Sequence, residues 1–181
     1  MAKSRVPSKF PATYSQINLK LEQTALHLIA LLVADKPLKY ACKKYALENL
    51  LAVSEDIENS QVIQMTVEVA TTFRLIHWNS KHHELTHPVG DLWPIAEIDE
   101  TEPLSVLEAC NKIIHATHLT FWRRKVRNYP AEYLEPYVIL TGTKGRRTWE
   151  AQIHMLIFCN EVLAWHGNYE PLGVRLKRGE A

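Results

Sequence analysis

The chain has few cysteines, and none stands in a spacing that would bind zinc or build a disulfide framework. Its 181 residues include three cysteines, Cys42, Cys110 and Cys159, which lie far apart in apolar stretches. An odd number without a Cys-x-x-Cys spacing argues against paired disulfides and against a zinc knuckle. We therefore expect buried free thiols and a reducing, cytoplasmic environment.

The chain also lacks a long apolar run. The most apolar window, residues 24–34, is eleven residues long and includes His27, whereas a helix that spans a bilayer needs about 20 apolar residues. Residues 1–14 carry basic side chains and two prolines but no apolar run, so we expect no signal peptide there. These observations predict a single soluble domain, residues 1–181, with no membrane contact and with loose ends at 1–14 and 171–181.

An excess of one charge is missing as well, because the formal net charge is +1. Residues 54–110 carry two basic against eleven acidic side chains, and the basic residues concentrate on both sides of this segment. The uniform basic excess of a dedicated DNA-binding protein is therefore absent. The alternation favours a bipolar surface through which two copies form a homodimer, with simple solvated helix faces as the alternative.

The first half of the chain shows helical periodicity. Residues 17–34 are apolar on nearly all sides, which is typical of a helix at the centre of a domain. Pro37 is expected to end this helix and to open a second one that reaches residue 53. A third helix is predicted for residues 54–78, although the β-branched stretch 63–69 also allows a strand.

The second half is less regular. Residues 79–103 lack periodicity and are predicted to form a long connection, after which Pro103 opens a fourth helix that reaches Ala116. Residues 119–122 and 137–141 are prone to form strands, and the turn residues 142–145 favour a small hairpin.

A last helix is predicted from a cap at Thr148 to a stop at Gly167. The expected fold is therefore mainly α: a bundle of about five helices with a small β-hairpin inserted before the last one.

One short motif has the form of a zinc hydrolase site. His83, Glu84 and His87 form His-Glu-x-x-His, and on a helix the two imidazoles could hold zinc while the glutamate activates water. Pro88 follows directly and disfavours helical geometry at His87. We interpret these histidines as loop residues or an adventitious metal site, keep a zinc hydrolase as an alternative, and include no metal and no cofactor in the main interpretation.

A second candidate site is the pair Asn111 and His115 on the fourth predicted helix. Residues four apart share a helix face, so the amide and the imidazole could position and protonate a phosphate ester or a ribose hydroxyl. The alternative is structural: a histidine bonded to a neighbouring helix beside a buried asparagine.

The stretch from Pro103 to Ala116, and the stretch Leu140 to Trp149, resemble segments of bacterial proteins of HEPN-like character. This resemblance implies a helical bundle, often dimeric, in families of RNA-cleaving toxins and phage-defence proteins. Their signature is an arginine, often followed by asparagine, and then a histidine that four to six residues separate from the arginine. Asn111 and His115 match the last two, but Glu108, Ala109 and Cys110 occupy the places for the arginine, which implies weakened catalysis.

A third candidate is a basic cluster interleaved with aromatic residues. Its members are Arg123, Arg124, Lys125 and Arg127, with Phe121, Trp122 and Tyr129 between and beside them. Such a cluster could grip single-stranded nucleic acid by phosphate contacts and stacking. Alternatively, the aromatic rings pack inward and the basic groups pair with the acidic segment 97–102.

Three functions therefore remain open from the sequence. The first is a HEPN-like protein that associates with RNA and is catalytically weakened, in a defence or mobile-element context. The second is a dimeric interaction protein without enzymatic activity. The third is the zinc hydrolase.

Overall fold

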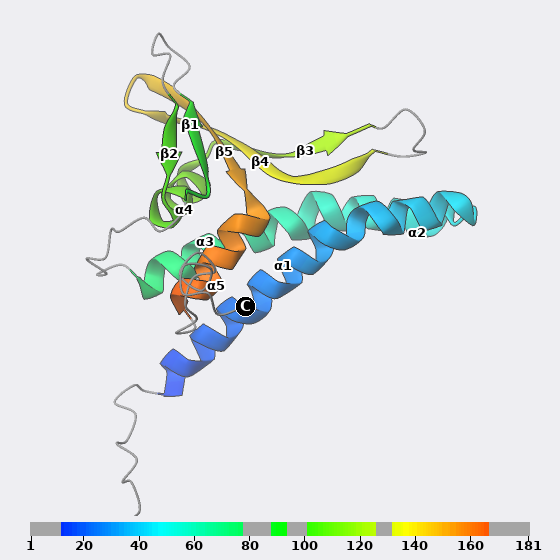
Figure 1. The fold of residues 1–181 in the computed structure, drawn as a ribbon, viewed down its shortest axis with the longest axis horizontal. Helices are drawn as coiled ribbons and strands as arrows, with labels where there is room; N and C mark the ends of the chain where they lie inside the picture. The colour runs from blue at the N-terminus through cyan, green and yellow to red at the C-terminus, as the bar shows by residue number, and fades with distance from the viewer. Residues whose placement is uncertain (1–11, 78–87, 94–100, 126–131, 167–181) are drawn as a thin grey trace, which may run out of the picture.

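The computed structural model describes residues 12–77, 88–93, 101–125 and 132–166. It has an α+β fold, in which helices cover one face of a five-stranded antiparallel sheet (Figure 1). The prediction of a mainly α bundle with a small hairpin insertion is therefore wrong. The segments 1–14 and 171–181, which were expected to be loose, lie almost entirely outside the described residues.

The helical layer begins with a helical hairpin. Helix α1 spans Ala12–Lys44, and helix α2 (Glu48–Ile57), the π-helical turn η1 (Glu58–Val62) and helix α3 (Ile63–Ile76) follow one another back alongside it (Figure 1). Residues 54–76 are helical, as predicted, and the strand alternative for 63–69 is wrong. The predicted boundary between a second helix ending at residue 53 and a third beginning at residue 54 is also wrong, because α2 begins at Glu48 and continues across it.

Helix α1 does not end at Pro37, contrary to the prediction of a break there. Proline removes one backbone N–H and so leaves the carbonyl of Val33 without its usual helical donor. Both residues lie on the exposed side of α1, where water can satisfy that carbonyl. The cost of the proline is therefore small enough for the helix to continue.

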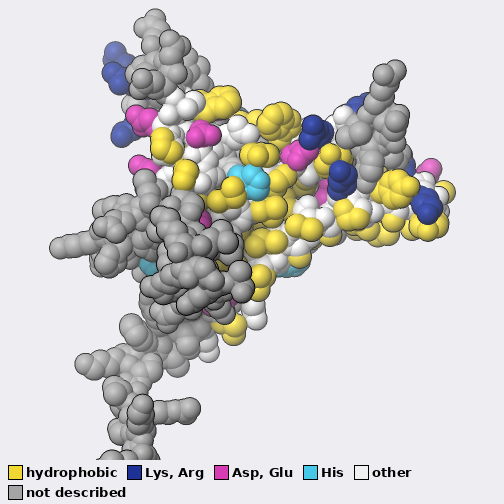
Figure 2. All heavy atoms as spheres, viewed as in Figure 1, with side chains coloured by type: hydrophobic (Ala, Val, Ile, Leu, Met, Phe, Trp, Pro, Cys, Tyr) yellow, Lys and Arg dark blue, Asp and Glu magenta, His cyan; other side chains and the backbone are white. Residues whose placement is uncertain are grey.

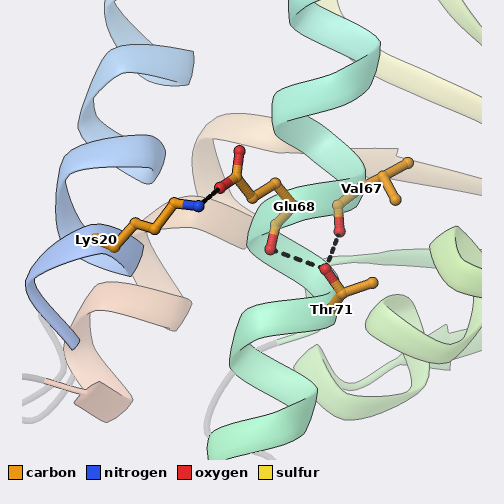
Figure 3. Close-up of polar contacts among 4 residues, drawn as sticks. All are labelled: Lys20, Val67, Glu68 and Thr71. Atoms are coloured by element: carbon orange, nitrogen blue, oxygen red, sulfur yellow. Dashed lines mark hydrogen bonds and ion pairs between the residues drawn. The ribbon is translucent and has the colours of Figure 1, made fainter. Parts of the chain in front are cut away.

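Polar contacts hold α3 against α1 (Figure 3). The ammonium of Lys20 on α1 lies 2.5 Å from a carboxylate oxygen of Glu68 on α3. One turn further along α3, the hydroxyl of Thr71 donates to the carbonyl oxygens of Val67 and Glu68, at 2.8 and 3.1 Å. The ion pair joins the two helices, whereas the Thr71 bonds stay within α3.

The sheet has the strand order β2-β1-β5-β4-β3 and is antiparallel throughout. Its strands are β1 (Gly90–Trp93), β2 (Glu102–Leu104), β3 (His118–Arg124), β4 (Tyr133–Lys144) and β5 (Arg147–His154). The expected hairpin around residues 142–145 is confirmed as the β4–β5 turn, where Gly145 has a φ of 65°. Glycine adopts this left-handed conformation without the strain that a Cβ would cause.

Two predictions for the second half of the chain are wrong. The region predicted as a connection, 79–103, contributes strand β1 and the start of β2. The last helix does not begin near Thr148, because residues 147–154 form β5 and helix α5 spans Met155–His166.

Helix α4 spans Val106–His115 and starts later than Pro103 because a capping box fixes its first turn. The hydroxyl of Ser105 accepts from the backbone N–H of Glu108, while the Glu108 carboxylate accepts from the backbone N–H of Ser105. This reciprocal arrangement satisfies donors that the helix itself cannot pair.

The core lies between the sheet and the helices. Its buried side chains come from α1, α3, α4 and α5 on one side and from alternate positions of the strands on the other, among them Val138, Leu140, Ala151 and Ile153. The three cysteines, Cys42, Cys110 and Cys159, are buried free thiols, as the sequence predicted. Burial raises the pKa of Cys159 to about 12 and that of Cys110 further, which makes both thiols unreactive.

Helix α1 contains a buried ion pair, and one member of the pair, Asp35, also bonds to the sheet. Asp35 lies 3.2 Å from the Lys39 ammonium, and both side chains are almost fully buried. The second carboxylate oxygen of Asp35 accepts a 2.7 Å hydrogen bond from the backbone N–H of Leu134, at the start of β4.

Candidate functional site

A cavity of about 610 Å³ opens on the face of the sheet that the helices do not cover. Strands β1, β3, β4 and β5 all contribute to it, and so does the first turn of α5. The side chains that matter for its chemistry are Asp91, Trp122, Arg124, Tyr137, Gln152 and His154. A volume of this size lies in the usual range for small-ligand sites, about 300–1,000 Å³.

Strand register places these side chains on one face. Tyr137 pairs with His154 across β4 and β5, and Asp91 pairs with Gln152 across β1 and β5. Because side chains alternate along a strand, each of these pairs points away from its buried neighbours. Trp122 alternates in the same way with the buried Phe121, and its side chain is 51% exposed.

A bulge in the β3–β4 pairing brings Trp122 toward Tyr137. The register shifts between Phe121 and Arg123, so that more residues of β4 than of β3 fill the interval. Pro136 lies in this interval, where its missing N–H removes no ladder hydrogen bond. Bulges bend a strand and redirect its side chains, and here the bend curves the sheet around the cavity.

Three aromatic rings form a row along the cavity. The ring centroids of Trp122 and Tyr137 lie 6.1 Å apart at 61°, and those of Tyr137 and His154 lie 4.7 Å apart at 76°. Edge-to-face contacts of this kind fix ring orientation and leave the exposed faces free for stacking. The row therefore presents a rigid aromatic wall rather than a set of loose side chains.

His154 has a second role at the start of α5. Its Nδ1 accepts from the backbone N–H of Ile157 at 3.3 Å, so its side chain caps the helix that begins at Met155. Partial burial lowers the pKa of His154, which favours the neutral ring that this hydrogen bond requires. With Nδ1 as the acceptor, the proton sits on Nε2, which makes that nitrogen a donor.

Charges of both signs border the cavity. The guanidinium of Arg124 lies 3.1 Å from the carboxylate of Glu135, and this hydrogen-bonded contact raises the pKa of Arg124. Arg123 and Lys125 are exposed on either side of Arg124 along the strand, while Asp91 is exposed on β1. The cavity can therefore offer both donors and acceptors to a polar ligand.

The candidate residues on α4 are not part of this site. The carbonyl oxygen of the Asn111 side chain accepts from Nε of Arg74 on α3 at 3.0 Å, and His115 is exposed at the end of α4. Strand β3 rises about 3.3 Å per residue, so Arg124 lies roughly 20 Å along it from His118, which follows α4 closely. The two groups of candidates occupy different layers and different ends of the molecule.

Arg74 is a residue that sequence reasoning missed. The HEPN-like resemblance would place an arginine at position 108, 109 or 110, where this chain has Glu108, Ala109 and the buried Cys110. The structure brings an arginine to Asn111 from α3 instead, 37 residues away in the chain. No spacing within α4 could have indicated this contact.

Other predicted residues fall outside the described part of the chain. These are the zinc-hydrolase motif with His83, Glu84 and His87, and also Arg127 and Tyr129 of the basic cluster. Of the cluster, Arg124 and Trp122 line the cavity, while Phe121 packs into the core. Tyr137, Gln152 and His154 were not predicted as site residues, because only the register of β4 with β5 brings them together.

Searches against protein-family models, curated proteins and solved structures found no match to this chain.

Proposed function

We propose that this protein binds single-stranded RNA on the open face of its sheet, with a nucleobase held in the aromatic cavity, and that it does not cleave the RNA. The observation that carries the proposal is the row of Trp122, Tyr137 and His154 beside the exposed basic end of β3. Proteins that bind single strands combine aromatic rings for stacking with a positive track for the phosphates.

The polar groups in the cavity suit the edge of a base. Gln152 offers an amide with both donors and acceptors, Asp91 offers a carboxylate, and Nε2 of His154 offers a donor. The carboxylates of Asp91 and Glu135 would repel a phosphate inside the cavity. The base would therefore enter the cavity, and the backbone would run along the exposed edge formed by β3.

The basic end of β3 supplies the phosphate contacts in this proposal. Arg124 shares the cavity face with Trp122, and Lys125 follows it at the end of the strand; both are exposed, whereas strand alternation turns Arg123 toward the opposite face. Because phosphate contacts release counterions, binding weakens with salt in proportion to the number of such contacts. Two contacts would give a slope of about −1.4 in a plot of log K against log salt for a single strand.

Binding without cleavage follows from the position of Asn111 and His115. They lie in the helical layer, away from the cavity, and the oxygen of Asn111 is engaged by Arg74. A general acid must lie within hydrogen-bond reach of the group that it protonates. The phosphates that flank a base in the cavity would therefore lie out of reach of Asn111 and His115.

The test is fluorescence anisotropy with labelled single-stranded RNA and a duplex of the same sequence, at low salt. Trp122→Ala is expected to weaken single-strand binding roughly tenfold or more, since stacking is worth about 1–3 kcal/mol per base. Leu75→Ala is the control, because Leu75 on α3 is 70% exposed and lies in the helical layer, away from the open face of the sheet. It should change the affinity by less than about twofold.

Gel electrophoresis of the same RNA tests the second half of the proposal. The RNA should remain intact with wild type, and His115→Ala should leave its affinity unchanged. The proposal is wrong if no single strand binds, if Trp122→Ala binds as well as wild type, or if His115→Ala abolishes a cleavage activity.

A further inference from the structure

Helix α1 carries two apolar stripes on opposite sides. One stripe is buried against the rest of the domain and consists of Leu21, Ala25, Leu28 and Leu32. The other is exposed and consists of Leu19, Leu26, Val33 and Tyr40, between 49% and 58% exposed; we call it the α1 seam. Two positions after each seam residue stands a buried residue, which places it about 200° around the helix. These buried residues are Leu21, Leu28, Asp35 and Cys42.

The α1 seam has the spacing of a helix-pairing surface. Its four residues recur every seven positions, and seven residues make nearly two turns, so they lie in one line along the helix. From Leu19 to Tyr40 this line is about 32 Å long at 1.5 Å per residue. Ala30, which is small and exposed, lies on the same line near its midpoint.

The exposed apolar surface around α1 is large for a monomer. Large apolar residues exposed by 37% or more are Ile17, Leu19, Leu26, Val33, Leu38 and Tyr40 on α1, and Tyr45, Leu47, Leu50 and Val53 on the turn and α2. Figure 2 shows hydrophobic side chains gathered over α1 and α2 on the visible face. Monomers rarely expose contiguous apolar patches beyond a few hundred Å².

The area agrees with what one side of a dimer interface requires. A large apolar side chain buries roughly 60–120 Å² of apolar surface, so ten of them at about half exposure offer on the order of 500 Å². A standard interface buries about 800 Å² per partner, of which about 65% is apolar in homodimers. The exposed apolar area around α1 and the apolar area that one partner of a homodimer buries are therefore nearly equal.

We propose that the α1 seam pairs with the α1 seam of a second copy, antiparallel, about a two-fold axis near Ala30. Lys36, Lys43 and Lys44 lie toward the C-terminal end of α1. A parallel pair would bring these lysines together, whereas an antiparallel pair places them at opposite ends of the interface, and a closed two-fold contact buries the same patch on both copies.

A lipid surface is the competing occupant. By length and composition alone, Gln16–Lys44 could cross a membrane, and 22% of its most apolar window is buried in the domain. However, α1 is fastened to the sheet through Asp35 and to α3 through Lys20. The seven-residue spacing of the seam also suits a second helix better than a bilayer.

The first experiment measures mass by analytical ultracentrifugation over a range of concentrations. Wild type should be a dimer, and Leu26→Glu should dissociate it, raising the dissociation constant by on the order of 100-fold: about tenfold at each of the two symmetry-related sites. Leu75→Glu is the matched control, because Leu75 on α3 is 70% exposed and lies off the seam. It should leave the dimer intact.

Circular dichroism checks that each variant folds, as expected for substitutions at exposed positions. A monomeric wild type, or a dimer that survives Leu26→Glu, would overturn the proposal. So would a monomer that binds neutral phosphatidylcholine vesicles and loses this binding in Leu26→Glu, since the seam would then be a lipid surface.

Cross-linking tests the orientation. The native thiols are buried, so Ala30→Cys introduces an exposed one close to the proposed axis and should form a disulfide-linked dimer on oxidation. Leu19→Cys should not, because an antiparallel pair separates the two copies of residue 19 by about the full length of the seam. Efficient cross-linking through Leu19→Cys would show a parallel pair and refute the two-fold axis at Ala30.

Discussion

The buried ion pair between Asp35 and Lys39 gives a prediction whose size follows from the structure. Their side chains are 4% and 0% exposed, and Asp35 also accepts from the backbone N–H of Leu134. Asp35→Asn keeps an oxygen for that N–H but removes the charge that faces the Lys39 ammonium. Breaking a buried pair by removing one partner costs about 3–5 kcal/mol, because the remaining charge stays in a poorly solvating site.

The expected loss is a large part of the total stability, since domains unfold with about 5–15 kcal/mol. At this chain length it corresponds to a fall in the melting temperature of roughly 10 °C. Lys39→Met should cost a similar amount, because it leaves the Asp35 carboxylate buried without its cation. The double variant, Asp35→Asn with Lys39→Met, should be more stable than either single variant, because neither partner of the pair is then left buried without the other.

Urea denaturation followed by circular dichroism measures all three variants. Lys36→Met serves as the control: Lys36 is exposed, and its ammonium lies 4.7 Å above the Tyr133 ring, a contact worth about 0.5–1 kcal/mol. The reasoning fails if the single variants lose less than about 1 kcal/mol each and their effects simply add. Such a result would mean that Asp35 and Lys39 do not face each other in a closed core.

Two further predictions concern the borders of the cavity. The pKa of His154 is lowered in the folded state, so its contribution to stability is fully present above the unfolded pKa of about 6.5 and is lost as the pH falls below that value. The melting temperature of the wild type should therefore fall over this pH range. In His154→Asn, which caps α5 without titrating, that fall in the melting temperature should disappear. At Gly90, an added Cβ would lie 2.1 Å from the backbone oxygen of Gln152, so Gly90→Ala should displace β1 and destabilise the fold by about 1–3 kcal/mol. Gly145→Asn should be tolerated, because asparagine adopts positive φ. Thermal melts measure both variants.

The sequence predicted those elements whose signal is local. The β4–β5 turn contains glycine at the position with positive φ, and the short segments 119–122 and 137–141 do lie within β3 and β4. The helix over α3 was found from its apolar period. In each case neighbouring residues carry the information, and no distant partner is needed to interpret it.

Strand β5 was missed because two periods overlap at its end. Trp149, Ala151 and Ile153 alternate with polar residues, which is a strand pattern, but α5 begins directly after His154. With no connecting residues between strand and helix, the apolar residues of both elements combine into an apparent helical stripe. The strand then becomes evident only from its pairing with β4 and β1.

The binding cavity shows a different limit. Trp122 and Arg124 were predicted from a local cluster, yet Tyr137 and His154 are ordinary residues in the sequence. Their meeting depends on the register of β4 with β5 and on the bulge opposite Trp122. A single sequence contains no direct measure of register, so two of the three rings in the aromatic row could not be predicted.

The apolar character of α1 was interpreted as that of a central helix, and this interpretation is half correct. Leu28 is fully buried, whereas Leu26, two positions earlier, is 57% exposed. Composition shows that both sides of the helix are apolar but not that only one of them packs inside the domain. A stripe that faces the core and a stripe that faces a partner have the same chemistry, so only a structure separates them.

The two proposals make a joint statement about how a dimer would display its cavities. The buried stripe of α1 faces the domain core, and Asp35 links this side of α1 to the sheet, so the seam points away from the sheet. Two copies joined through their seams would have helices in the middle and open sheet faces on the outside. An RNA too short to reach both cavities should therefore bind Leu26→Glu and wild type equally well, and a difference would mean that the cavity and the seam are coupled.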